Sequence, residues 1–149
     1  MFGTVQPTVT AVGGCLCGAV RFSVRGPIRR TVTACHCRTC RRFSGGVFAA
    51  TAIEPSSLVL DRAESLKWHR SSDHARRGFC GECGSSLFWE ATDEPFMSVS
   101  AAALDEPTGL VLATQSWIAE CADFWRFGPE VLLKEGPSEL GGPPRKPES

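Results

Sequence analysis

The stretch of sequence that decides the fold is CGECG at residues 80–84, in which two residues separate a pair of cysteines. This spacing lets the sulfur atoms of Cys80 and Cys83 face one metal ion, and glycine at the tight turn brings backbone N–H groups toward those sulfurs. The pattern is typical of a zinc knuckle. Because a knuckle supplies two ligands and a structural zinc site has four, another part of the chain must complete the site.

The sequence CLC at residues 15–17 offers the missing pair. Side chains at positions i and i+2 of a strand point to the same face, so Cys15 and Cys17 can bind the same ion. Glycines at positions 13, 14 and 18 ease a tight backbone around the pair. A closed site formed with Cys80 and Cys83 would tie the first strands to the middle of the chain.

A third cluster, CHCRTC at residues 35–40, provides three thiolates from one compact loop: Cys35, Cys37 and Cys40. Three protein ligands with a fourth position open are the arrangement of a catalytic zinc. Zinc held by three thiolates is a weaker Lewis acid than zinc held by three imidazoles. Activation of a substrate thiol therefore fits this cluster as well as activation of water does.

Disulfide bonds and iron–sulfur clusters are less favoured interpretations of these cysteines, because of the cysteine spacing and the expected reducing compartment. Neighbours such as Cys15 and Cys17 are awkward disulfide partners, and the spacings differ from those usual for iron–sulfur clusters. A purely structural second metal stays open, with a fourth ligand borrowed from elsewhere in the chain. The residues that could supply that ligand are His36, His69, His74 and Cys121.

The length of the chain favours a single domain, and its balanced charge does not favour binding to a highly charged partner such as nucleic acid. The chain has 149 residues, with 16 basic and 16 acidic side chains and a formal net charge of +0. A zero balance gives no general attraction to nucleic acid or membrane. We see neither a secretory signal nor an apolar run long enough to span a bilayer, so we expect a cytoplasmic protein whose thiols stay reduced.

Short apolar runs separated by glycine, proline and polar turns predict a mostly β fold class with few helices. The expected strands lie at 20–24, 47–53, 57–60, 65–69, 86–89, 96–100 and 115–118. Single helical turns are expected at 39–43 and 123–127. Residues 8–130 form one predicted domain, and the Pro- and Gly-rich segment 136–149 is a predicted disordered tail.

Three blocks of sequence together resemble one known family. They are GCLCGAVRF at 14–22, CHCRTCRR at 35–42 and FCGECGSSLF at 79–88, and they resemble the glutathione-dependent formaldehyde-activating enzyme family, which includes centromere protein V. The resemblance covers roughly residues 12–126 and implies an Mss4-like, zinc-pinned domain of short antiparallel strands. It also implies a ligand set for each zinc: Cys15, Cys17, Cys80 and Cys83 for a structural ion, and Cys35, Cys37 and Cys40 for a second, catalytic ion.

The resemblance implies carbon–sulfur lyase chemistry, in which formaldehyde and glutathione combine reversibly as S-hydroxymethylglutathione. We hypothesise that the cluster at Cys35, Cys37 and Cys40 activates the thiol. Three arginines nearby are candidates to hold a substrate carboxylate: Arg38, Arg41 and Arg42. Gln115 occupies the place at which family members commonly carry a histidine.

Two other functions remain alternatives. One is a zinc-stabilised module that binds protein or nucleic acid through its arginine-rich stretch, although the zero net charge counts against nucleic acid. The other is a hydrolase that activates water at zinc. No membrane partner is expected.

Overall fold

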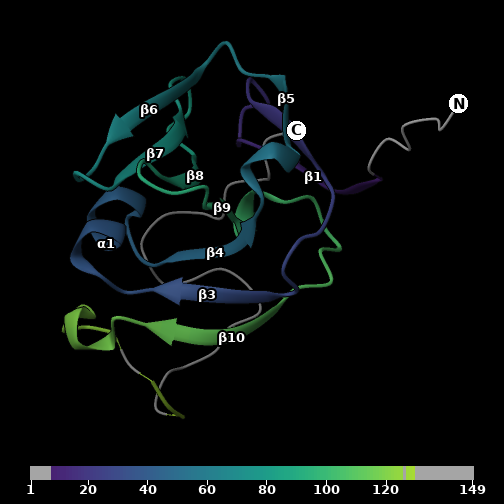
Figure 1. The fold of residues 1–149 in the computed structure, drawn as a ribbon. Coiled ribbons are helices and arrows are strands. Elements are labelled where there is room, and N and C mark those ends of the chain that lie inside the picture. Colours follow the sequence, from purple (N-terminus) through teal and green to yellow (C-terminus); the bar gives the residue numbers. More distant parts are fainter. Residues whose placement is uncertain (1–7, 126, 130–149) are drawn as a thin grey trace, which may run out of the picture.

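The fold consists of two β-sheets and one short α-helix (Figure 1), in a computed structural model that describes residues 8–125 and 127–129. The strands are β1 (Val9–Gly14), β2 (Arg21–Arg25), β3 (Thr31–Cys35), β4 (Phe48–Ile53), β5 (Leu58–Arg62), β6 (Leu66–Arg70), β7 (Ala75–Cys80), β8 (Ser86–Ala91), β9 (Met97–Ser100) and β10 (Val111–Ser116). The helices are α1 (Arg38–Ser44) and three 3₁₀ turns: η1 (Pro55–Ser57), η2 (Ala101–Ala103) and η3 (Ile118–Glu120). The mostly β class is thereby confirmed. Among the described residues, no helix has the length and apolarity needed to cross a membrane.

The larger sheet has seven strands in the order β10-β3-β4-β9-β8-β7-β6, and the smaller has the order β1-β2-β5. Neighbouring strands run antiparallel, except that β10 lies parallel to β3 at the edge of the larger sheet. Figure 1 shows β10 below β3, with α1 at the end of β3 where the chain turns back toward β4.

The core lies between the two sheets. Phe22 of β2 and Phe88 of β8 are essentially inaccessible to solvent, and their ring centroids are 5.0 Å apart in an edge-to-face arrangement. Val20, Val24 and Val99 complete the contact from the two sides. Each fully buried side chain of this size stabilises the folded state by about 1.5–3 kcal/mol, so the sheets hold each other in place.

The register of the larger sheet separates this core from a second, outer face. Phe88 pairs with both Gly78 and Val99, and this row packs on the core. The adjacent row pairs Arg77 with Trp89 and Trp89 with Ser98. Because successive side chains of a strand point to opposite faces, the row that contains Arg77 faces away from the core.

Six of the seven expected strands occur within two residues of their predicted limits, and the helical turn at 39–43 lies within α1. The strand expected at 115–118 is displaced, because β10 covers Val111–Ser116. The expected helical turn at 123–127 is wrong for the described residues there, which form only a turn. Three strands were not predicted: β1, β3 and β7. The predicted tail at 136–149 lies outside the described residues.

Candidate metal centres and active site

Four cysteines meet where the ends of β1 and β7 approach each other. The sulfur atoms of Cys15, Cys17, Cys80 and Cys83 all lie within 4.8 Å of one another. Those of Cys15 and Cys17 are 3.6 Å apart, and those of Cys17 and Cys80 are 3.8 Å apart. A tetrahedral zinc with Zn–S bonds of about 2.3 Å requires sulfur atoms about 3.8 Å apart. The four cysteines therefore fit one zinc ion.

Local hydrogen bonds favour the thiolate form of two members of this four-cysteine group, Cys15 and Cys83. The backbone N–H of Val20 donates to Cys15 Sγ at 3.2 Å, and the Ser85 hydroxyl lies 3.2 Å from Cys83 Sγ. Burial raises the pKa of Cys83, but the hydrogen bonds from Ser85 outweigh it and lower that pKa to about 5. The Ala19 N–H lowers the pKa of Cys17, while burial and the neighbouring sulfurs raise it to about 12. Because the sulfur atoms are so close together, some of the four cysteines are thiolates and others stay protonated. A divalent cation bound among them would displace the remaining thiol protons.

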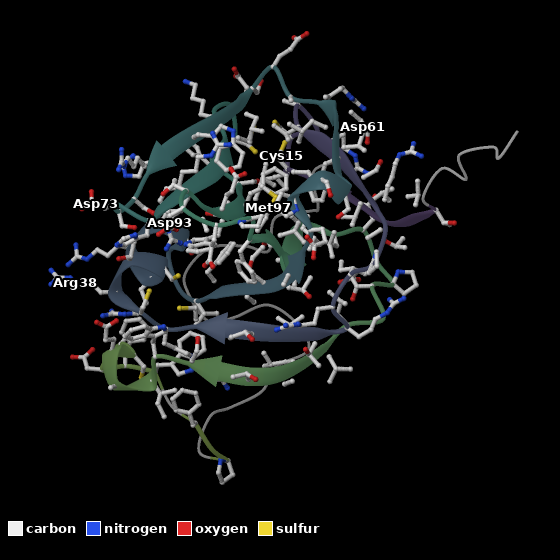
Figure 2. All side chains as sticks on the ribbon, in the orientation of Figure 1. Cys15, Arg38, Asp61, Asp73, Asp93 and Met97 are labelled. Atoms are coloured by element: carbon white, nitrogen blue, oxygen red, sulfur yellow. The ribbon has the colours of Figure 1, made fainter. Side chains whose placement is uncertain are left out.

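The second cluster forms at the junction of β3 and α1. Cys35 is the last residue of β3, Cys37 is the N-cap of α1, and Cys40 lies in the first turn of that helix. Cys37 Sγ accepts a hydrogen bond from the Cys40 N–H at 3.3 Å, which folds the loop so that all three sulfurs lie within 4.8 Å of one another. Figure 2 shows sulfur atoms gathered near Cys15 and others gathered beside α1.

The chain brings no fourth ligand to this three-cysteine group within the part that the structure describes. The histidines and Cys121 that the sequence offered for that role do not join it. The donor set is thus three sulfurs with one coordination position left over. Three thiolate ligands with about this spacing suit zinc, whose fourth ligand would have to come from outside the chain.

His36 lies between two of the cysteines, but it points away from the cluster. Its side chain is completely buried, and Nε2 donates to Gln115 Oε1 of β10 at 2.7 Å. Its ring packs edge-to-face on Trp125, with centroids 5.0 Å apart. His36 therefore donates to a neighbouring group and does not line the cavity beside the cysteines. His36 anchors the cysteine loop to β10.

A cavity of about 780 Å³ opens beside the three-cysteine group on the outer face of the larger sheet. All three cysteines contribute to its wall, and Thr31 and Thr33 continue that wall along β3. Small residues of the sheet and a set of aromatic and charged side chains complete the wall, the latter including Arg29, His74, Arg77, Trp89, Phe96, Trp117 and Glu120. The cavity is therefore apolar in part, with two guanidinium groups and one carboxylate on its wall and sulfur at one end.

The arginines proposed from the sequence lie elsewhere. Arg38 and Arg42 line a separate hollow beside His69, and Arg41 is absent from the wall of the cysteine cavity. Figure 2 shows Arg38 at the outer edge of α1, with its side chain directed away from the protein. The structure does not bring these three arginines together with the cysteines in the described cavity.

Arg77 is a residue of this cavity that the sequence analysis did not find. Its guanidinium donates to Cys40 Sγ at 3.4 Å, although 37 residues separate the two in sequence. Burial raises the pKa of Cys40 to about 12, while this hydrogen bond and the charge of Arg77 oppose that rise. The surrounding sequence HARRGF is typical of an exposed turn, so no signal in the sequence marked Arg77 as buried.

Comparisons with known proteins place the chain in one family. The model of the family described as glutathione-dependent formaldehyde-activating enzyme matches residues 10–120. A putative glutathione-dependent formaldehyde-activating enzyme of Halomonas elongata is 31% identical in an alignment of 107 positions, and the match covers 64% of this chain and 68% of that protein. An uncharacterized lyase of Schizosaccharomyces pombe is 31% identical over 54% of this chain and 58% of its own length.

One solved structure is similar along most of the fold. A Rhodobacter sphaeroides protein of known crystal structure is 27% identical, with a TM-score of 0.58, and the match covers 70% of this chain and 99% of that chain. The match of the family model spans both cysteine groups and the strands that hold them. The chain therefore belongs to the glutathione-dependent formaldehyde-activating enzyme family, and it is an enzyme.

Proposed function

We propose that the protein is a zinc-dependent carbon–sulfur lyase that joins a small thiol such as glutathione to formaldehyde and also catalyses the reverse reaction. The observation that carries the proposal is the opening of Cys35, Cys37 and Cys40 into a cavity of about 780 Å³. Membership of the family supports this reaction class.

The two cysteine groups have different proposed roles. Cys15, Cys17, Cys80 and Cys83 would hold a structural zinc, since they supply four ligands and leave no position for substrate. Cys35, Cys37 and Cys40 would hold a second zinc. When bound there, zinc lowers the pKa of a thiol that reaches its fourth position, so that the thiolate is available at neutral pH.

The stretch of β3 that lines the cavity is long enough for a tripeptide thiol to lie along it. Thr31, Thr33 and Cys35 share one face of β3, and the four residue steps from Thr31 to Cys35 span about 13 Å at the usual strand rise. An extended tripeptide is about 10 Å long. With its sulfur beside Cys35, such a substrate extends toward Arg29, whose guanidinium can pair with a carboxylate.

Arg29 fits the role of carboxylate partner better than the arginines of α1 do. Arg29 shares the cavity with the cysteines, whereas Arg38 and Arg42 line a different hollow. Trp89 and Phe96 add an apolar stretch to the wall of the same cavity.

The proposed reaction is an addition without redox change. The thiolate sulfur attacks the aldehyde carbon and a carbon–sulfur bond forms. The π electrons of the carbonyl move to oxygen, which takes a proton from water. In reverse, the hydroxyl loses its proton, the carbonyl reforms and the carbon–sulfur bond breaks.

Eight free cysteines fit a reducing compartment, and we propose the cytoplasm as the location.

The test is the rate of exchange between glutathione, formaldehyde and their adduct, measured by NMR exchange spectroscopy with and without zinc-loaded protein. We expect about two zinc ions per chain and a rate above the uncatalysed one. Cys37→Ser should lose one zinc and the acceleration while it keeps its fold, because the four-cysteine group is intact.

Cys80→Ser is the matched comparison. We expect it to lose the structural zinc and much of the thermal stability. Wild-type protein that holds two zinc ions and still leaves the exchange rate unchanged would exclude the lyase proposal. If Cys37→Ser unfolds the protein as severely as Cys80→Ser does, the catalytic role of the three-cysteine group is wrong.

A further inference from the structure

Arg77 is a buried cation without a carboxylate partner among the described residues. Its relative exposure is 4%, and it is the only arginine, lysine, aspartate or glutamate in the described part of the chain that is buried. None of the ion pairs between described residues includes it. Its neighbour Arg76, on the opposite face of β7, pairs with Glu90 and is partly exposed. Burial of a guanidinium is costly unless a negative charge compensates it.

The contacts of Arg77 fix its orientation toward the three-cysteine group. Nε donates to the Ser71 hydroxyl at 3.1 Å, and Nη1 donates to Cys40 Sγ at 3.4 Å. The guanidinium carbon lies 5.6 Å from the centre of the Phe43 ring, so one face of the group is covered by α1. Cys40 is the only one of these partners that can carry a negative charge.

The net charge of a zinc-loaded three-cysteine group agrees with a position of Arg77 beside it. Three thiolates and one divalent zinc ion sum to −1, and Arg77 contributes +1. The four-cysteine group would carry −2 when loaded, and no buried arginine donates to it in the described residues. We infer that Arg77 is the built-in counter-ion of the second metal site, a positioning residue that orients Cys40 and strengthens metal binding by the three cysteines. This inference rests on the metal site of the proposed function.

A role as counter-ion has a specific consequence for metal affinity. A hydrogen bond from outside the ligand set typically changes metal affinity by about 10–100-fold when it is lost. Loss of Arg77 should therefore weaken metal binding at Cys35, Cys37 and Cys40, and leave the four-cysteine group as it is. Arg77 also lines the cavity, so the same charge would face the thiolate of a substrate bound there.

The test compares Arg77→Gln and Arg77→Lys with Arg76→Gln as the control on the same strand. Zinc affinity of each site is measured by competition with a colorimetric chelator, and cobalt(II) replaces zinc in a parallel experiment so that the thiolate-to-metal absorption reports on Cys40. We expect Arg77→Gln to bind the second ion about 10–100-fold more weakly with an altered cobalt spectrum. Arg77→Lys, which retains the charge, should recover most of the affinity, and Arg76→Gln should match wild type.

The outcomes separate this inference from the proposed function. If wild-type protein binds a single metal ion, the second metal site fails and the counter-ion role fails with it. If wild type binds two ions and Arg77→Gln binds both with unchanged affinity, only the counter-ion role is wrong. Should Arg77→Gln fail to fold, Arg77→Lys decides: folded protein with wild-type affinity supports the role of charge, and a 10-fold or greater loss overturns it.

Discussion

At the scale of single residues, Trp117 combines backbone strain with a position on the cavity wall. Its φ of 56° and ψ of 39° lie in the left-handed region, which a bulky residue rarely adopts. Its side chain is 65% exposed although it lines the cavity that holds the cysteines. Strain at such a place is commonly retained because the side chain serves function.

Trp117→Gly should separate strain from function. The left-handed conformation costs a non-glycine residue about 1–2 kcal/mol, and glycine adopts it freely at some cost in chain entropy. We expect unchanged or slightly raised stability in urea unfolding, together with a several-fold higher KM for the thiol. Trp117→Ala keeps the strain and should raise KM without a gain in stability. A stability loss of more than about 1 kcal/mol in the glycine variant would contradict the strain argument.

The ion pair between Arg21 and Asp105 gives a pH-dependent contribution to stability. Arg21 donates to both carboxylate oxygens of Asp105, at 3.1 and 2.5 Å. These hydrogen bonds lower the pKa of Asp105 below its ordinary value of 3.8. A folded-state pKa below the unfolded one stabilises the fold above the ordinary pKa, and that contribution disappears as pH falls through the lowered value.

Asp105→Asn should therefore cost about 0.5–1 kcal/mol at pH 7, since the carboxyl is about half exposed and screened by solvent. The measurement is the difference in urea unfolding free energy between wild type and variant. Loss of metal in acid affects both proteins equally, so the difference isolates the carboxylate. It should stay constant from pH 7 to about pH 5 and shrink below about pH 4. Growth of the difference in acid would show that the sign is wrong.

At the scale of elements, Gly78 determines how β7 fits between its neighbours. A Cβ at this position would lie 3.0 Å from Phe88 and 3.2 Å from Trp68. These two rings stack with centroids 6.0 Å apart across the glycine. The missing side chain is thus what lets the rings of β6 and β8 meet over β7.

Gly78→Ala should push the rings apart and destabilise the fold by about 1–3 kcal/mol, the usual cost of overpacking a core. Gly46→Ala is the matched control, because a Cβ there meets no atom within 4 Å and the backbone is not left-handed. The control should leave stability unchanged or raise it slightly. Urea midpoints give both values, and equal midpoints for the two variants would refute the packing argument.

The elements also show how far the sequence predicts the structure. Strands with alternating or continuous apolar residues, such as Phe48–Ile53, were found because burial imposes that pattern on them. β7 was missed because its two arginines and a glycine break the pattern, although tertiary contacts with Cys40 and Glu90 bury or pair those charges. β3 was missed because its small residues give a weak apolar signal.

The sequence predicts the cysteines of the candidate site but not the other residues that line the cavity. Local spacing identified the three cysteine clusters, and the resemblance supplied their pairing. The cavity partners Arg29, Arg77 and Trp117 come from distant segments that sheet register brings together, and spacing along the chain carries no information about such meetings.

At the scale of the whole molecule, the four-cysteine group joins the two sheets. Cys15 and Cys17 follow β1 of the smaller sheet, and Cys80 and Cys83 flank the turn between β7 and β8 of the larger one. The three-cysteine group, by contrast, lies within one corner of the larger sheet. Removal of metal should therefore have unequal consequences at the two groups.

Titration with a chelator should remove the ions in two steps. With both proposed sites loaded, we expect the first ion to leave from Cys35, Cys37 and Cys40, which would hold it with three ligands, and the proposed catalytic activity to disappear with little change in circular dichroism. The second ion should leave from the four-cysteine group, with cooperative loss of the fold, because structural zinc contributes to folding free energy directly. Metal analysis alongside circular dichroism checks the order. Loss of the fold with the first ion would reverse the assignment of the two groups.

The parallel edge strand β10 has a consequence for motion. Five of its six residues are exposed, and its attachment consists mainly of the ladder with β3 and the hydrogen bond from His36 to Gln115. A strand that buries so little can detach at a lower free energy than the whole fold needs to unfold. Amide hydrogens of β10 should therefore exchange with deuterated solvent sooner than those of β4. Because Trp117 and Glu120 lie shortly after β10 and line the cavity, each detachment of the strand would open one wall, through which substrate and product would enter and leave.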